Sequence, residues 1–383
     1  MTAASFDLGD DQRAVAETAR RFAAERIAPK ALDWDRDKHF PVEVMAEAAA
    51  LGMGAIYVRD DVGGSEMSRL EAALIFEALA TGCPTVAAFI SIHNMVAWMV
   101  DRYGTPGQRR DWLPGLATME LIASYCLTEP GSGSDAAALA TRAVAEGDDY
   151  LVTGTKQFIS GAGAADLYLT MVRTGEAGPQ GISTLLIPKE TEGLSFGPNE
   201  RKMGWNAQPT RQVIFDQCRV PQALRLGDEG MGFKIAMAGL DGGRLNIAAC
   251  SLGGAQAAFE QAASYTHQRR AFGQTLDQFQ TVQFKLADMA TSLEAARVLL
   301  YRAAAALDRQ DPRATALCAM AKRFVTDAGF NVANDALQLH GGYGYLADYG
   351  LEKIVRDLRV HQILEGSNEI MRLIIARSLG GER

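Results

Sequence analysis

The spacing of hydrophobic residues changes twice along the chain, and this feature limits the possible folds more than any other. From about Leu8 to Leu121, apolar residues recur at steps of three and four, as on one face of an α-helix. Between about Ala123 and Val220, short β-rich runs alternate with glycine and polar turns. Helical spacing returns after Gly227. The pattern predicts an all-helical domain over 1–122, a β domain over 123–226 and a helical bundle domain over 227–383.

The middle region contains four runs with the composition of strands, at 150–152, 167–172, 182–187 and 212–215. No helix long enough to cross between parallel strands separates these runs. We therefore expect a small antiparallel barrel or sandwich.

The last region contains a long hydrophobic seam, formed by Phe279, Val282, Leu286, Met289, Leu293, Ala296 and Leu300. Alternating steps of three and four are typical of a bundle helix. Further helices are predicted over 233–269, 313–340 and 367–379. Together they predict a four-helix bundle, so the expected fold class is mainly α with a central β domain.

Composition and charge exclude several classes of protein. The chain has 383 residues, which is enough for two or three domains of ordinary size. Its 38 lysines and arginines are outnumbered by 46 aspartates and glutamates, and the net charge of -8 argues against a nucleic-acid partner. The basic pairs Arg269-Arg270 and Lys322-Arg323 are expected on solvated faces, because most such pairs lie there.

Cysteine usage and the first residues indicate the compartment. The five cysteines are scattered, without a Cys-x-x-Cys pair, so we expect neither a disulfide framework nor a metal site. The start, Met1 to Asp11, is acidic and lacks the features of a secretory signal. No apolar stretch reaches the ~20 residues of a membrane-spanning helix. We expect a cytoplasmic protein, or one of the mitochondrial matrix if a transit peptide has been removed.

Two glycine-containing segments are candidate ligand sites. Gly161 to Asp166 superficially resembles a dinucleotide-binding fingerprint, but Asp166 replaces the third small residue and no helical pattern follows, so we reject a nicotinamide site there. YCLTEPGSGSD, Tyr125 to Asp135, lies where the helical pattern gives way to the β pattern. Its backbone N–H groups and hydroxyls can face a planar or anionic ligand, although its composition alone favours a domain linker.

The second segment resembles the first signature of the acyl-CoA dehydrogenase family. The similarity extends over nearly the whole chain and is also carried by IFEALATGC (75–83), SIHNM (91–95), GWNAQP (204–209) and LHGGYGYL (339–346). Among the subfamilies, the sequence looks closest to isobutyryl-CoA dehydrogenase, which acts on a short branched-chain substrate. The resemblance implies an FAD-dependent oxidoreductase of valine catabolism or, more widely, of fatty acid metabolism. It also implies a homotetramer with FAD at a subunit interface, and electron-transferring flavoprotein as a partner.

The resemblance implies a set of cofactor-binding residues. Phe158 is expected to pack on the flavin, where many relatives carry tryptophan, although a strand core residue is the simpler interpretation of Phe158 alone. His340 followed by two glycines is by itself a helix C-terminus, and both interpretations can hold. The implied FAD contacts are Tyr125, Cys126, Leu127, Thr128, Gly133, Ser134, Phe158, Ile159, Ser160, Arg269, Phe272, Phe279, Gln280, Gln338, Leu339, His340, Gly341, Gly342, Ser367, Asn368 and Glu369.

Glu365 is the candidate catalytic base. It lies in ILEGSNE, where aliphatic residues precede it and Gly366 lets the backbone approach a ligand. Its sequence context alone favours a turn or capping carboxylate, whereas by resemblance it matches the family's catalytic glutamate. The family's second position for the base precedes an arginine, here Arg244, and Gly243 leaves that position without a carboxylate. Substrate contacts are implied for Ser134, Asp241, Gly242, Gly243, Arg244 and Arg377, although Asp241 and Arg244 are also spaced for an ordinary helix ion pair.

The reaction implied by the resemblance converts a short acyl-CoA into the 2-enoyl-CoA. Glu365 takes the α-proton, and a hydride leaves the β-carbon for FAD. An acyl-CoA oxidase of similar build is one alternative, and it would release peroxide under air. A non-catalytic flavin- or CoA-binding protein is another, against which the intact Glu365 argues. A helical scaffold without a cofactor would give a colourless protein.

Overall fold

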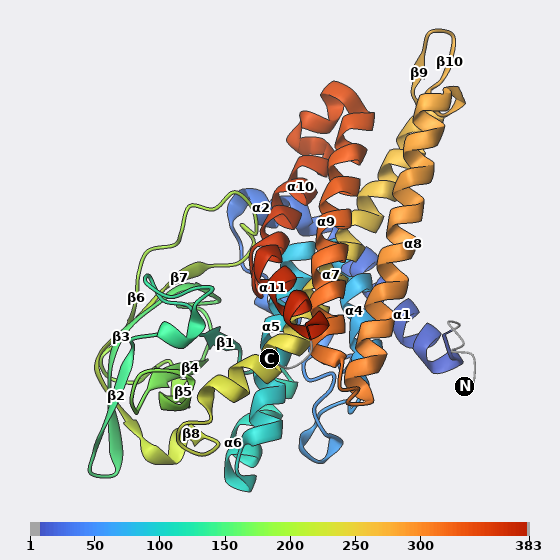
Figure 1. Ribbon diagram of the computed structural model, residues 1–383. Coiled ribbons are helices and arrows are strands. Elements are labelled where there is room, and N and C mark those ends of the chain that lie inside the picture. Colours follow the sequence, from blue (N-terminus) through green and yellow to red (C-terminus); the bar gives the residue numbers. More distant parts are fainter. Residues whose placement is uncertain (1–7, 381–383) are drawn as a thin grey trace.

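The structure, a computed structural model, describes residues 8–380. Two helical regions pack together, and a β domain lies against one side of them (Figure 1). Within 8–380, no helix is both long and apolar enough to cross a membrane.

The first region is all-helical, as predicted. Ser68 caps one of its helices, because its hydroxyl accepts a hydrogen bond from the Glu71 N–H while the Glu71 carboxylate accepts one from the Ser68 N–H. Pro84 occupies the first position of another, where its missing N–H carries no penalty. The helices are α1 (Asp10–Phe22), α2 (Ala31–Asp37), α3 (Val42–Ala49), α4 (Arg69–Gly82), α5 (Pro84–Tyr103) and α6 (Pro106–Ala117).

The β domain is one eight-stranded sheet with the strand order β6-β7-β3-β2-β4-β5-β8, and β1 pairs with β4. All four predicted runs lie in strands. The strands are β1 (Ala123–Cys126), β2 (Arg142–Glu146), β3 (Asp149–Ser160), β4 (Leu167–Arg173), β5 (Ile182–Pro188), β6 (Leu194–Phe196), β7 (Thr210–Pro221) and β8 (Arg225–Leu226).

The expectation of a purely antiparallel sheet is wrong at two places. β1 runs parallel to β4 over four residue pairs, and β2 meets β4 in parallel at Arg142 and Arg173. Parallel strands usually need a long crossover between them, most often a helix. Here the loop after β1 and the β2–β3 hairpin provide the connection instead, so the chain returns to the sheet in the same direction without a helix.

The last region is again helical. Its helices are α7 (Gly232–Gln268), α8 (Gln280–Asp308), α9 (Ala314–His340), α10 (Leu351–Arg359) and α11 (Asn368–Leu379). The predicted helices over 233–269, 313–340 and 367–379 agree with α7, α9 and α11 to within one residue. The short helix α10 was not predicted, because its hydrophobic pattern covers only about two turns.

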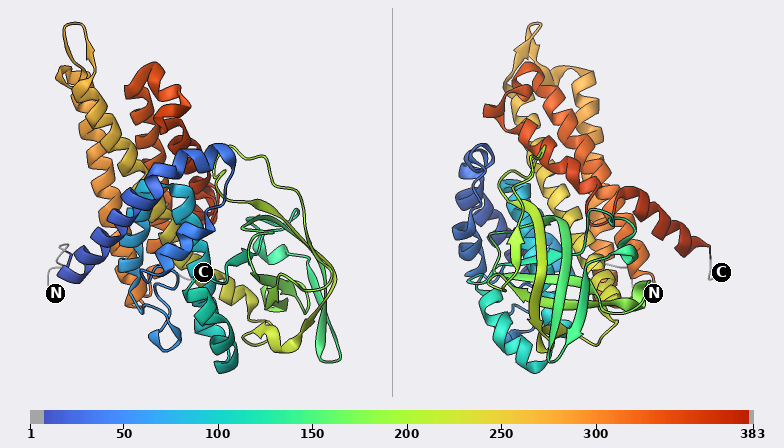
Figure 2. Two further views of the ribbon diagram at one scale, coloured as in Figure 1. Left: turned by 180° about the vertical axis from the view of Figure 1, so that it is seen from behind. Right: turned by 90° about the vertical axis from the view of Figure 1, so that its left-hand side faces the viewer.

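A two-stranded hairpin between α7 and α8 was also not predicted. Its strands are β9 (Arg270–Ala271) and β10 (Gln274–Thr275). Phe272 and Gly273 form the turn with φ angles of 50° and 86°, the left-handed pair that a two-residue hairpin turn requires. The hairpin projects from the end of the bundle that lies away from the β domain, in all the views (Figures 1 and 2).

Helix α7 joins the two helical regions into one core. Its glycines allow α4 to approach closely, and a Cβ at Gly253 would lie 2.0 Å from the Glu77 carbonyl oxygen and 2.9 Å from the Ala80 Cβ. All five cysteines are free and buried, which agrees with the expected absence of a disulfide framework.

This close approach predicts that Gly253→Ala lowers the free energy of unfolding by about 1–3 kcal/mol, because α4 and α7 must move apart. Gly107→Ala is the matched control. Gly107 lies near the start of α6, where a Cβ would meet only the Thr105 hydroxyl at 3.7 Å. That variant should gain roughly 0.5 kcal/mol from helix formation. Denaturant unfolding of both variants measures the change in the free energy of unfolding. An unchanged midpoint for Gly253→Ala would contradict the predicted close packing of α4 on α7.

Candidate active site

Glu365 lies on a short segment between the turn at Val360–Gln362 and helix α11. Its backbone is left-handed, with a φ of 55°, and Gly366 follows with a φ of 85°. Such a conformation in a residue other than glycine is costly and is concentrated at functional sites. The Oε2 atom of Glu365 is buried and has no hydrogen-bond partner among residues 8–380, so Glu365 is neither a turn nor a capping carboxylate.

Helix α7 provides the wall against which this carboxylate lies. A Cβ at Gly243 would lie 2.5 Å from Glu365 Oε2 and 3.0 Å from Met95 Sδ, so only glycine leaves room for the carboxylate in this position. The next residue, Arg244, is buried and donates a hydrogen bond of 2.6 Å to Asp241. The helix ion pair predicted for Asp241 and Arg244 is therefore confirmed. Gly242 abuts the guanidinium of Arg69, which stacks on Tyr57 and Trp98.

The surroundings of Glu365 change its acidity. Burial raises the pKa of the Glu365 carboxyl to about 7, against the opposing charges of Arg244 and Lys322. Burial and the nearby Glu365 charge raise the pKa of Tyr125 well above its usual value. The Tyr125 hydroxyl and Arg244 Nε are, like Glu365 Oε2, buried atoms without a hydrogen-bond partner in the described chain. Buried polar atoms are normally paired, so these three indicate a binding site for a polar ligand.

The loop that follows Tyr125 is an ordered turn, whereas its composition had favoured a linker. Glu129 is buried and accepts hydrogen bonds from the Ala140 and Thr141 N–H groups and from Lys156 Nζ. Lys156 is fully buried and also donates to the Leu127 carbonyl. Of the predicted cofactor contacts on this loop, Cys126 and Leu127 are buried, Tyr125 and Thr128 are partly exposed, and Gly133 and Ser134 are exposed.

Phe158 is not a core residue of its strand. The pairing of β3 with β7 is interrupted between Lys156 and Ile159, and Phe158 there has a φ of 58° and a side chain that is 63% exposed. The bulge turns the ring outward while Ile159 stays buried and Ser160 half-buried. An exposed aromatic ring on a bulge fits a planar ligand such as a flavin.

A second group of predicted residues lies at the far end of the bundle. Arg269 and the end of α9 line a cavity of about 400 Å³ together with Gln338, Leu339, His340, Gly341 and Gly342. His340 ends α9 and Gly341 has a φ of 56°, as the helix C-terminus interpretation predicted. Nothing lies within 4 Å of a Cβ built at Gly341 or Gly342. Phe272, at the hairpin tip, is 95% exposed, while Phe279 and Gln280 begin α8.

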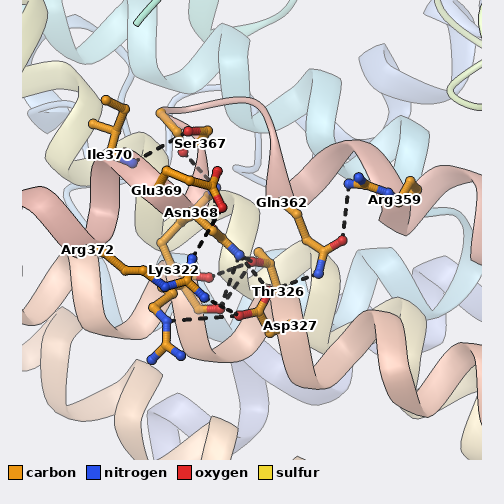
Figure 3. Close-up of polar contacts among 12 residues, drawn as sticks. Lys322, Thr326, Asp327, Arg359, Gln362, Ser367, Asn368, Glu369, Ile370 and Arg372 are labelled. Atoms are coloured by element: carbon orange, nitrogen blue, oxygen red, sulfur yellow. Dashed lines mark hydrogen bonds and ion pairs between the residues drawn. The ribbon is translucent and has the colours of Figure 1, made fainter.

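The remaining predicted residues follow Glu365 along the chain. Ser367 caps α11 and accepts a hydrogen bond from the Ile370 N–H, and Glu369 is exposed. Asn368 is buried, and its amide is engaged by Lys322, Thr326 and Asp327 (Figure 3). Arg377 is exposed in the last turn of α11, which places it about 13 Å along the helix axis from Asn368. The chain itself does not bring Arg377 to Glu365.

The expectation of a solvated face is wrong for Lys322. The residue is fully buried on α9, four residues after buried Cys318 and three before buried Val325. Its place on the apolar stripe of a predicted helix was the signal that could have identified it. Met95 and Tyr57 were also missed, because only the folded chain shows which residues from the first region meet α7.

The family models for the acyl-CoA dehydrogenase N-terminal, middle and C-terminal domains match residues 9–120, 124–218 and 230–380. Mitochondrial isobutyryl-CoA dehydrogenase of Dictyostelium discoideum is 57% identical over 98% of this chain and 90% of its own length. The Bos taurus enzyme of the same name is 54% identical over the same shares. The solved structure of butyryl-CoA dehydrogenase from Megasphaera elsdenii has a TM-score of 0.95 and 36% identity, covering 98% of this chain and 99% of the other.

These matches extend over all three domains, including both segments that carry the unpaired polar atoms. The exposed Phe158 ring and the Tyr125 hydroxyl, which has no hydrogen-bond partner among residues 8–380, fit a planar flavin ring. The open glycines after α9, at the other end of the bundle, leave room for an extended part of such a cofactor. The chain therefore belongs to the acyl-CoA dehydrogenase family of FAD-dependent oxidoreductases.

Proposed function

We propose that the chain oxidises short branched acyl-CoA thioesters, with isobutyryl-CoA as the preferred substrate and Glu365 as the base. The observation that carries the proposal is the Glu365 Oε2 atom, which is buried, has no hydrogen-bond partner among residues 8–380 and lies beside the backbone of α7. The branched substrate is supported by the two relatives named isobutyryl-CoA dehydrogenase, which share more than half of their aligned residues with this chain.

A base for this reaction must remove a proton from the carbon next to the thioester carbonyl. A carboxylate in water is too weak a base for this step. Burial raises the pKa of Glu365 to about 7, which makes it a stronger base and still leaves it partly ionised at neutral pH. The Glu365 N–H finds no acceptor among residues 8–380, so it is free to donate to the thioester oxygen as negative charge develops there. Bound FAD would supply the acceptor for the hydride from the β-carbon, which completes the oxidation to the 2-enoyl thioester.

We propose further that each FAD is held by two chains. The residues around Tyr125 and Phe158 belong to the β domain, whereas Arg269, Phe272 and the α9 end lie at the far end of the bundle (Figures 1 and 2). The hairpin end of the bundle lies away from the β domain in all the views (Figures 1 and 2), which supports contact of one cofactor with these two groups on different chains. The exposed Phe272 ring and the cavity beside Arg269 therefore serve the cofactor of a neighbouring copy, within the homotetramer that is typical of the family. Electron-transferring flavoprotein is the proposed acceptor of the electrons.

Glu365→Gln should retain yellow FAD and bind acyl-CoA, yet lose flavin bleaching by substrate by a factor of about 10³ or more, because the amide cannot take the α-proton. Anaerobic stopped-flow absorbance with a panel of straight and branched acyl-CoAs measures this loss. In the wild type, isobutyryl-CoA should bleach the flavin fastest.

Glu43→Gln is the control, because it removes a carboxylate that is exposed on α3 and lies outside the implied FAD and substrate contacts. It should bleach at nearly the wild-type rate. Full-speed bleaching by Glu365→Gln would exclude Glu365 as the base, and a faster rate with straight-chain thioesters would exclude the isobutyryl preference.

The acceptor is tested separately by mixing the substrate-reduced enzyme with air or with electron-transferring flavoprotein. We expect rapid reoxidation by the flavoprotein and little peroxide under air. Stoichiometric peroxide at a comparable rate would instead identify an oxidase.

Phe272→Asp should lower the FAD content of the purified protein several-fold, because a carboxylate then replaces an apolar ring at the proposed contact with the neighbouring chain. Absorbance at the flavin band relative to protein measures the content, and size-exclusion chromatography measures the assembly. Phe284→Asp is the control, because Phe284 is also exposed, on α8, but lies outside the proposed FAD contacts. Equal FAD content in Phe272→Asp and wild type would contradict the two-chain site.

A further inference from the structure

Lys322 is a fully buried lysine with no bonded carboxylate in the described chain. Its side chain lies on the core face of α9, between Cys318 and Val325, and is 0% exposed. Lysine is almost never buried completely unless an acid pairs with it. No carboxylate oxygen of residues 8–380 lies within the 4.0 Å of an ion pair with its ammonium group. Some other function must keep this cation in the core.

The ammonium group holds the segment that carries Glu365. Lys322 Nζ donates hydrogen bonds to the Gly366 carbonyl at 2.8 Å and to Asn368 Oδ1 at 2.9 Å (Figure 3). Gly366 is the residue next to Glu365, and both have left-handed backbones. A charged donor on this carbonyl is stronger than a neutral one, so it stabilises a backbone conformation that is otherwise unfavourable.

Neighbouring side chains fix the acceptor that Lys322 uses. The Asn368 amide nitrogen donates to Asp327 Oδ1 at 2.7 Å and to Thr326 Oγ1 at 3.1 Å, so the amide oxygen must face the ammonium group. Gln362, from the turn before Glu365, donates to the same Asp327 oxygen at 2.8 Å. The network therefore joins both ends of the Glu365 segment to α9 (Figure 3).

We propose that Lys322 is the positioning residue of the base: it fixes the Glu365-Gly366 backbone through the Gly366 carbonyl and places a positive charge beside the carboxylate. The inference rests on the proposed role of Glu365.

The charges around Glu365 make Lys322 the less compensated of two cations. Arg244 on α7 and Lys322 on α9 both oppose the rise in the Glu365 pKa, while Tyr125 on β1 and Tyr57 before α4 are the other titratable groups that face it. Arg244 is already paired with Asp241 at 2.6 Å, which cancels part of its field. Apart from Glu365, the anions near Lys322 are Asp327 and Glu369, and neither forms an ion pair or a hydrogen bond with its ammonium group.

The sign of the effect on catalysis follows from the charge. Burial lowers the pKa of Lys322 to about 8, so the charged form still predominates at pH 7 and favours the ionised form of Glu365. Catalysis needs that ionised form, so kcat/KM should rise with pH through a midpoint near 7 in the wild type. Removing the positive charge should move this midpoint upward.

The test compares two replacements in the FAD-loaded full-length enzyme, over pH 5.5 to 9. Lys322→Met removes the charge and the donor, whereas Lys322→Gln removes the charge and keeps an amide donor. Both should raise the midpoint of kcat/KM by about one pH unit, a loss of about tenfold at pH 6. At pH 9 the base is ionised in every variant. There Lys322→Met should remain at least about tenfold slower, because its Glu365 segment is no longer fixed, and Lys322→Gln should recover more of its rate.

Lys234→Met is the charge control, because Lys234 is exposed on α7 and the same change there should leave the midpoint in place. Asn368→Asp gives a second route if the Lys322 variants do not fold, since a carboxylate beside the ammonium should also raise the midpoint. An unchanged midpoint in folded Lys322→Gln and Asn368→Asp would overturn the inference. If Glu365→Gln still bleaches its flavin, the proposed base itself fails, and that outcome is distinct from this one.

Discussion

The Glu365 Oε2 atom has no hydrogen-bond partner in the described part of the chain and lies against the backbone of α7, and the rest of the site depends on this constraint. A Cβ atom at Gly243 would lie too close to Glu365 Oε2, so the carboxylate can pack against α7 only because residue 243 is a glycine. An unpaired buried acid is unfavourable for folding, and the cost must be offset elsewhere. The long helix α7, packed against α4, α5 and α9, provides that stability.

Charge is distributed around this acid so that it stays basic and still ionises. Burial alone would keep the Glu365 proton bound at neutral pH, and the two cations nearby alone would make it too weak a base. Burial, opposed by the charges of Arg244 and Lys322, raises the pKa of Glu365 to about 7, which is within the working range of a general base. The buried Glu129–Lys156 pair has a different role in the β domain. The two charges form an ion pair with each other, and the pair stabilises the loop after β1.

Most of the architecture could be predicted from the sequence, because long helices and strands repeat their hydrophobic pattern many times. The limits of α7 and α9 were predicted to within one residue for this reason. The parallel pairing of β1 was not predictable, since it depends on where a distant strand lies. Glu365 was predicted as the base by resemblance, but the lack of a partner for its Oε2 among residues 8–380 and the hydrogen bond from Lys322 to Gly366 depend on contacts between residues more than 40 positions apart. Local patterns carry no record of such contacts.

The β9–β10 hairpin also has a consequence for the protein in dilute solution. The Phe272 ring, at the tip of the two-residue turn, is 95% exposed, and contact of an apolar ring with water is unfavourable. In the two-chain arrangement proposed above, that ring is covered only when copies meet and a cofactor lies between them. Assembly and FAD binding are then coupled equilibria, so the apparent affinity for FAD depends on the protein concentration.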